Sequence, residues 1–204
     1  MSRRGFFKRV FGGPVKQSML AVQVVVPVYA LTDFRAKLHN VIEGTHHEVH
    51  GPDEKRVYYR KIVAVLEQAL AHYEYGYWEY LEDDAAADGF HEWVTEIENE
   101  LALDEEGTGD EADDTFRLDA DKRFIAVTVI LLVHGPMPNV AELDPEDEDN
   151  WTRHAMAERL RDLNRVDFAG LLADAVYLVP GNDQDGFSDM DLADEGWAHL
   201  VMLH

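Results

Sequence analysis

Histidines form the densest group of chemically capable side chains in this chain. Four of them fall within twelve residues: His39, His46, His47 and His50. Neutral imidazoles with neighbouring carboxylates bind zinc, nickel or copper. Their order lacks the His-Glu-x-x-His spacing of helical zinc proteases, and a solvated polar loop over 45–53 explains the same residues. The alternatives are therefore a surface loop, or a metal-binding protein or metal-dependent enzyme that uses these four histidines.

The segment after residue 180 contains acidic residues at the spacing of a calcium loop. Aligned on Gly186, it places Asp183 and Asp185 at the third and fifth ligand positions. The first and twelfth positions require an acidic ligand and a bidentate glutamate, and this chain has neither there. Ser188 and Asp191 instead predict a capping box at the start of a last helix.

Other catalytic motifs are missing from the sequence. The chain has no cysteine, which excludes disulfides, thiolate nucleophiles and zinc–thiolate sites. It contains neither a Gly-x-Ser-x-Gly elbow nor a glycine-rich phosphate loop after a strand. Carboxylate pairs are too frequent in so acidic a chain to indicate acid–base catalysis. The sequence therefore predicts a protein that is not an enzyme and uses no cofactor.

Charge is distributed unevenly along the chain. The 204 residues include 18 Lys and Arg against 41 Asp and Glu, a net charge of -23. The first eighteen residues contain five basic and no acidic groups, so the remainder carries 13 basic and 41 acidic groups, a net charge of -28. A body this negative repels phosphate backbones, which excludes nucleic-acid binding by the domain. The charge favours either a basic protein partner or adaptation to a saline cytoplasm.

The N-terminal segment 1–18 combines basic and aromatic residues. Its phenylalanines recur at helical spacing and its cations fill the remaining positions. Such a helix suits an anionic membrane surface or a partner protein. The residues expected to make this contact are Arg3, Arg4, Phe6, Phe7, Lys8, Arg9 and Phe11.

The paired arginines also resemble a twin-arginine export signal. That signal needs an apolar stretch soon after the arginines and a small-residue cleavage site. Here Gly-Gly-Pro-Val-Lys-Gln-Ser intervenes, and cleavage after Ala30 would remove an expected core strand. A cytoplasmic protein, peripheral at a membrane, is the preferred location, and export is the alternative.

Apolar periodicity divides the rest of the chain into strands and helices. Short runs rich in branched and aromatic residues predict four strands, at 19–28, 75–81, 123–133 and 171–179. Apolar residues at helical spacing predict four helices, at 33–44, 57–73, 85–103 and 151–164. Residues 104–121 are acidic and predict a loop.

These elements predict one acidic domain over 19–204, without a linker that would separate two units. We expect an α/β fold, with α+β as the alternative: a small sheet of about four strands with helices packed on it. Strand 123–133 is apolar on both faces, as an interior strand should be. With helix 151–164 and strand 171–179 it predicts a C-terminal β-α-β unit with parallel neighbouring strands.

Several of these segments resemble a known family. The segments that carry the resemblance are Phe124-Ile-Ala-Val-Thr128, Met137-Pro138, paired leucines at 160 and 163, the strand and turn Leu172 to Gly181, and Asp185 to Leu192. They are similar to an uncharacterised-domain family of cyanobacteria, other bacteria and plastids that includes the plant fluctuating-light acclimation protein. The resemblance implies an accessory or regulatory protein near energy-converting membranes. The family has no known catalytic residues to assign to positions of this chain.

The leading hypothesis is a non-enzymatic accessory protein whose acidic domain binds a protein partner. Its basic N-terminus would dock on a membrane or a membrane complex. The charge difference between residues 1–18 and the rest motivates this hypothesis. The alternative is the metal-binding protein that uses the histidine cluster.

Overall fold

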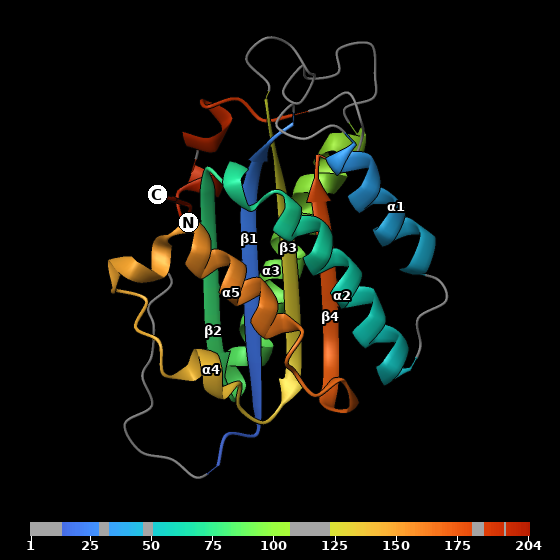
Figure 1. Cartoon of the computed structure of the whole chain (residues 1–204), viewed down its shortest axis with the longest axis vertical. Helices are drawn as coiled ribbons and strands as arrows, with labels where there is room; N and C mark the ends of the chain where they lie inside the picture. The colour runs from blue at the N-terminus through green and yellow to red at the C-terminus, as the bar shows by residue number, and fades with distance from the viewer. Residues whose placement is uncertain (1–13, 29–32, 47–50, 107–122, 181–185, 194) are drawn as a thin grey trace.

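A computed structural model of the chain describes residues 14–28, 33–46, 51–106, 123–180, 186–193 and 195–204. Its elements alternate between strands and helices along the chain, and the strands assemble into one sheet (Figure 1). The strands are β1 (Gln17–Pro27), β2 (Tyr75–Glu82), β3 (Phe124–His134), β4 (Leu171–Val179) and β5 (Val201–Met202).

The sheet has the strand order β4-β3-β1-β2-β5, and each neighbouring pair is antiparallel. The two central strands, β1 and β3, pair over eleven residues, from Gln17 opposite His134 to Pro27 opposite Phe124. All of β1 from Ser18 onward and all of β3 up to Val133 is buried. This burial is the physical reason for their almost unbroken runs of valine, isoleucine and leucine, since helices cover both of their faces.

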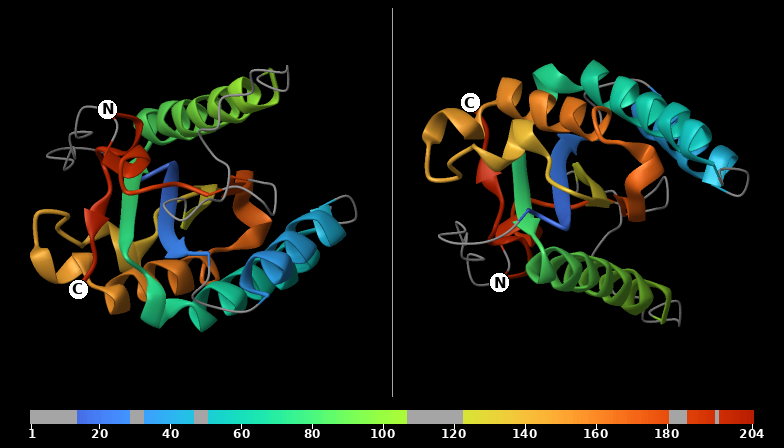
Figure 2. Two further views of the ribbon diagram at one scale, coloured as in Figure 1. Left: turned by 90° about the horizontal axis from the view of Figure 1, so that it is seen from above. Right: turned by 90° about the horizontal axis from the view of Figure 1, so that it is seen from below.

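Helices cover the two faces of the sheet unequally (Figure 2). The longer helices on one face are α1 (Phe34–His46), α2 (Pro52–Gln68) and α5 (Arg153–Leu163). The other face is covered by α3 (Asp84–Glu106). Short turns complete the chain: η1 (Leu70–His72), α4 (Pro138–Ala141), η3 (Glu148–Trp151), η4 (Phe168–Gly170), η5 (Asp191–Ala193) and η6 (Glu195–Trp197).

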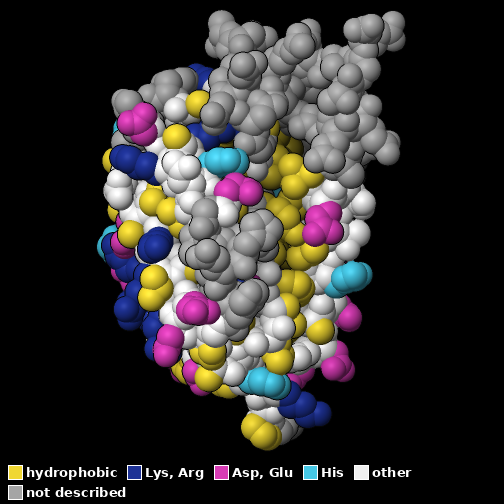
Figure 3. All heavy atoms as spheres, turned by 90° about the vertical axis from the view of Figure 1, so that its right-hand side faces the viewer, with side chains coloured by type: hydrophobic (Ala, Val, Ile, Leu, Met, Phe, Trp, Pro, Cys, Tyr) yellow, Lys and Arg dark blue, Asp and Glu magenta, His cyan; other side chains and the backbone are white. Residues whose placement is uncertain are grey.

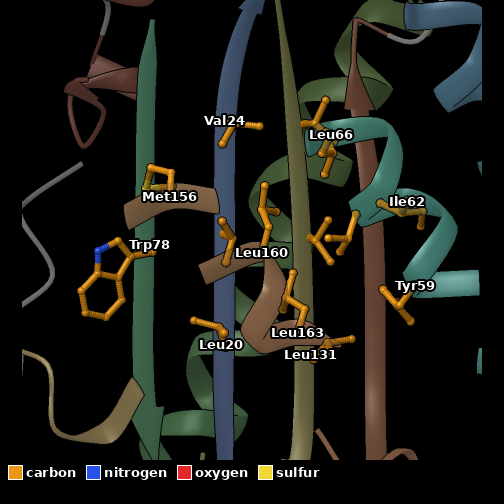
Figure 4. Packing of buried hydrophobic residues seen from close by; sticks show 14 of the residues in the cluster. Leu20, Val24, Tyr59, Ile62, Leu66, Trp78, Leu131, Met156, Leu160 and Leu163 are labelled. Atoms are coloured by element: carbon orange, nitrogen blue, oxygen red, sulfur yellow. The ribbon is translucent and has the colours of Figure 1, made fainter. Parts of the chain in front are cut away.

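The larger hydrophobic core lies between the sheet and the face formed by α1, α2 and α5. Figure 4 shows Met156, Leu160 and Leu163 of α5 lying over the strands. Ile62 and Leu66 of α2 join the same cluster and are fully buried. The 3.6-residue period of each helix places these apolar side chains on one stripe, which explains why both helices lie flat on the sheet.

The second core lies under α3. Ala86, Trp93 and Ile97 of this helix pack against the sheet residues whose side chains point to the opposite face, among them Met19 and Ile130. Because side chains alternate along a strand, each central strand contributes to both cores. The domain is therefore a three-layer arrangement with a central sheet.

The predicted small sheet with helices packed on it is confirmed, and β4 occupies the predicted range 171–179. The predicted parallel arrangement of strands 123–133 and 171–179 is wrong, because β3 and β4 pair antiparallel. The chain between them crosses the sheet twice. Met137 lies near the end of β2, since its N–H donates to the Tyr80 hydroxyl. Arg153 lies near the start of β2, since its guanidinium donates to the Tyr73 carbonyl. Helix α5 then returns, so β4 begins beside the end of β3.

The start of β1 is anchored earlier than the expected boundary at residue 19. The Lys16 N–H donates to Asp83 Oδ1 at 2.9 Å, and the Ser18 hydroxyl donates to the Gly135 carbonyl at 2.7 Å. Residues 14–18 therefore belong to the folded body. None of the helices in the described ranges has the length and apolar character needed to cross a bilayer.

Candidate functional site

The four histidines of the sequence cluster are only partly placed. His39 is exposed on α1, and His46 is the last residue of the same helix. They lie seven residues apart, about two helical turns, whereas imidazoles on one helix share an ion most readily at one turn. His47 and His50 lie outside the described residues. Within the described part of the chain, no three His, Asp or Glu side chains converge as a metal site, so the histidine site stays a prediction.

Other predicted sites fall mainly outside the described residues. These include the N-terminal contact residues Arg3, Arg4, Phe6, Phe7, Lys8, Arg9 and Phe11, most of the acidic loop, and the two aspartates of the calcium-like loop. The capping box that follows is confirmed, but the last helix that it was expected to start is reduced to the three-residue turns η5 and η6. The Ser188 N–H donates to Asp191 Oδ2 at 2.7 Å, and the Asp191 N–H donates to Ser188 Oγ at 3.1 Å. This reciprocal pair starts η5.

The sheet face under α3 contains a buried polar chain that sequence reasoning missed. Gln23 of β1 is 3% exposed and Thr128 of β3 is 1% exposed. The Gln23 amide donates to Thr128 Oγ1 at 2.8 Å, and its oxygen lies 2.7 Å from His199 Nε2. The only sequence signals were a glutamine and a threonine inside apolar runs, at positions that the β1–β3 register pairs directly.

Aromatic rings surround this polar chain. The His199 ring lies 5.0 Å from the Tyr77 ring and 5.6 Å from the Trp93 ring, both edge to face, and it stacks on Trp197 at 6.4 Å. The Trp93 indole donates to the buried carboxyl of Glu79 at 2.8 Å. The arrangement fastens the C-terminal segment to the sheet. The hydrogen bonds and ring contacts of this group join its members to one another, so we describe it as a structural network.

One small pocket lies at the end of the sheet where β2 begins. Its volume is about 250 Å³, and its lining includes His72, Glu74 and Arg153. Small-molecule sites usually range from roughly 300 to 1,000 Å³. The Arg153 guanidinium already donates to the Tyr73 carbonyl at 2.7 Å. We therefore do not assign substrate chemistry to it.

Charge is segregated between the two helical layers. The sequence of α3 contains nine Asp and Glu residues and no Lys or Arg. Together, α1, α2 and α5 contain nine Lys and Arg residues against six Asp and Glu. Asp84, Asp88, Glu92 and Glu98 of α3 are exposed. The acidity of the chain is thus not spread evenly, and one face of the molecule presents an anionic helix with no cations of its own.

Strand β4 forms one edge of the sheet beside this acidic helix. Its one charged side chain, Asp174, is turned toward α2: Asp174 Oδ2 lies 2.6 Å from Lys55 Nζ and accepts from the Tyr59 hydroxyl at 2.7 Å. On the opposite face of β4 the Tyr177 hydroxyl donates to Glu98 Oε1 at 3.2 Å. Burial, reinforced by the charge of Glu98, raises the pKa of Tyr177 to about 12, so the phenol remains a neutral donor.

Apolar side chains accompany this edge. Figure 3 looks onto this side of the molecule and shows a band of apolar atoms along it. Leu172 is 42% exposed, and the half-buried residues of the band include Ala173, Ala175, Tyr177, Val94 and Leu101. A strand edge that pairs with no further strand among the described residues, an apolar floor and an acidic flank together form the candidate interaction surface.

Comparisons with known proteins add no further constraint. No protein-family model, no curated protein and no solved structure matches this chain.

Proposed function

We propose that this chain is a non-enzymatic accessory protein that binds a basic protein partner through its α3 face. The observation that carries the proposal is the charge segregation, in which α3 has nine acidic and no basic residues. An anionic face raises the rate at which a cationic partner associates and disfavours anionic competitors. On this proposal, the basic-aromatic N-terminus docks the protein on an anionic membrane or a membrane complex.

The test for partner binding is affinity capture from the native source with two matched variants. The first reverses three exposed α3 charges: Asp84→Lys, Asp88→Lys and Glu92→Lys. The control reverses Glu142, Glu146 and Glu148, which are exposed elsewhere, and therefore changes the net charge equally. We expect the α3 variant to lose the partners that wild type retains, while the control keeps them. Equal loss in both variants, or retention in both, would contradict the α3 face as the binding surface.

The test for membrane docking is deletion of residues 1–13. This boundary spares Lys16 and Ser18, which are hydrogen-bonded to the folded body. We expect the shortened protein to move from the membrane fraction to the soluble fraction of the native cell. A retained membrane fraction would remove this part of the proposal while leaving partner binding untouched.

A further inference from the structure

The two edges of the sheet differ in how they are covered. At one edge, β5 pairs with β2 at Tyr75 and Gly76. Further along β2, the Trp151 ring lies 5.8 Å from the Tyr77 ring and 5.9 Å from the Trp78 ring. At the other edge, β4 pairs with β3 alone among the described elements, and the residues from Leu171 to Tyr177 all retain partial exposure. The accessible edge is therefore β4.

Proteins usually protect a long edge strand against pairing with other chains. Lysine, proline within the strand or an inward-pointing charge are common protections. Strand β4 reads Leu-Leu-Ala-Asp-Ala-Val-Tyr-Leu-Val, with no lysine and no proline. Its single aspartate is held by Lys55 and Tyr59. The register shift at Leu132/Val133 leaves Leu172 without a partner near the start of β4, and Pro180 follows the strand. The regular edge therefore covers the seven residues 173–179, with Asp174 as its one inward-pointing charge.

From this edge we infer that β4 binds an extended segment of a partner protein as an added strand. The main-chain N–H and C=O groups on the outer side of β4 supply the hydrogen bonds, as in other cases of β-strand addition. This inference rests on the proposed partner binding and specifies where and how the partner is recognised.

The side chains beside β4 determine the composition of that segment. Toward α3, the small residues Ala173 and Ala175 leave room for long side chains, and Glu98 marks the acidic flank. Toward α2, Val176 is half-buried, while Lys55 supplies positive charge. Because side chains alternate along a strand, the best-matched segment alternates basic residues, directed at α3, with apolar residues directed at α2.

The probe for this inference is a fluorescein-labelled octapeptide of alternating valine and lysine, titrated into the full-length protein by fluorescence anisotropy. Two further versions of the peptide are methylated on main-chain nitrogens. One carries the methyl group at every valine and the other at every lysine. N–H groups of alternate residues in a strand point to opposite edges, so an added strand needs only one of the two sets. We expect saturable binding, and a loss of affinity of about tenfold or more for one methylated version only.

Charge-reversal variants locate the bound peptide. Glu98→Lys lies beside Tyr177 of β4, whereas Glu142→Lys is an exposed control outside α3 that changes the net charge equally. We expect Glu98→Lys to weaken binding of the valine–lysine peptide several-fold and Glu142→Lys to change its affinity little. Hydrogen exchange of the β4 amides should slow in the complex.

Several results would overturn the inference: no binding up to about 1 mM peptide, equal effects of the two methylated versions, or equal effects of the two charge variants. These outcomes are separable from failure of the proposed function. If native partners are still lost when the α3 charges are reversed, partner binding survives and only the strand-addition mode is rejected.

Discussion

The Gln23 side chain shows how a single polar residue is accommodated inside an apolar strand. It is 3% exposed, and it links Thr128 of the neighbouring strand to His199 of the C-terminal segment. A buried amide without such partners would cost about 1–3 kcal/mol. The hydrogen bonds therefore make Gln23 compatible with the core and fix how the last residues meet the sheet.

Removing one partner of this link should destabilise the domain more than removing both. We expect Gln23→Met to lower the free energy of unfolding by about 1–3 kcal/mol, since the Thr128 hydroxyl loses its bond. Adding Thr128→Val should recover part of that loss, because the buried hydroxyl is then replaced by an apolar group of the same shape. Urea unfolding of the two single variants and the double variant measures this coupling. Strictly additive effects would show that the Gln23–Thr128 bond contributes little.

Buried tyrosines should make the protein sensitive to high pH. Burial is the first cause that raises the pKa of Tyr58, Tyr80 and Tyr177, each to about 12. Their pKa in the unfolded chain is about 10, so folding favours the protonated phenol. This stabilisation is complete below pH 10 and is lost as the pH rises through 12.

The corresponding measurement is a phenolate absorbance titration of native and urea-unfolded protein. At pH 11 we expect the native protein to show clearly less phenolate than the unfolded chain. Tyr177→Phe should reduce the loss of unfolding free energy between pH 10 and 12, because one of the titrating phenols is removed. Identical native and unfolded titrations would show that these hydroxyls are not buried in solution.

At the scale of the elements, α5 decides the topology of the C-terminal half. Its N-terminus lies beside the beginning of β2, where the Arg153 N–H donates to the His204 carbonyl at 3.2 Å. From there the helix crosses the sheet and brings the chain back to the end of β3. The preceding residues 135–152 have already made the opposite crossing, so strand β4 runs antiparallel to β3.

The first turn of α5 depends on a defined cap. The Thr152 hydroxyl accepts a hydrogen bond from the Ala155 N–H at 3.0 Å. We expect Thr152→Ala to lower the free energy of unfolding by about 1 kcal/mol, whereas Thr152→Ser should retain most of the cap. Thermal unfolding of the two variants measures the difference. An alanine variant as stable as wild type would show that this end of the helix is capped by other means.

At the scale of the whole molecule, charge is organised by layer. The acidic excess of α3 faces solvent on one side of the sheet, and most cations of the described residues lie on the helices of the other side. Repulsion among like charges destabilises a compact state, and salt screens it. The net charge of -23 therefore lowers the stability of the folded state at low ionic strength.

Thermal stability should accordingly increase with ionic strength. We expect the Tm to rise between roughly 0.01 and 0.5 M NaCl, as the screening length falls from about 30 Å to a few ångströms. The variant with Asp84, Asp88 and Glu92 changed to Lys should have a higher Tm than wild type at low salt, and the gap should narrow at high salt. A Tm independent of salt would indicate that repulsion on α3 is weak.

The local patterns of the sequence predicted the principal strands and helices correctly. Unbroken β-branched runs identified β1 and β3, the alternating aromatic run identified β2, and the predicted strand 171–179 coincides with β4. These predictions succeeded because the spacing of apolar residues in a segment shows which of its faces is buried against the neighbouring layer of the fold. The Ser188–Asp191 capping box was predicted for the same reason, since its two hydrogen bonds join residues three apart.

What the amino-acid sequence determined by itself was the principal strands and helices and the general architecture of a small sheet with helices packed on it. Tertiary structure alone decided the antiparallel β3–β4 pairing, the burial of Gln23 beside His199, the charge difference between layers and the position of β4 at the edge of the described sheet. These features depend on which distant segments become neighbours. A pattern within one segment records how that segment is buried, but it does not record the partner against which it is buried.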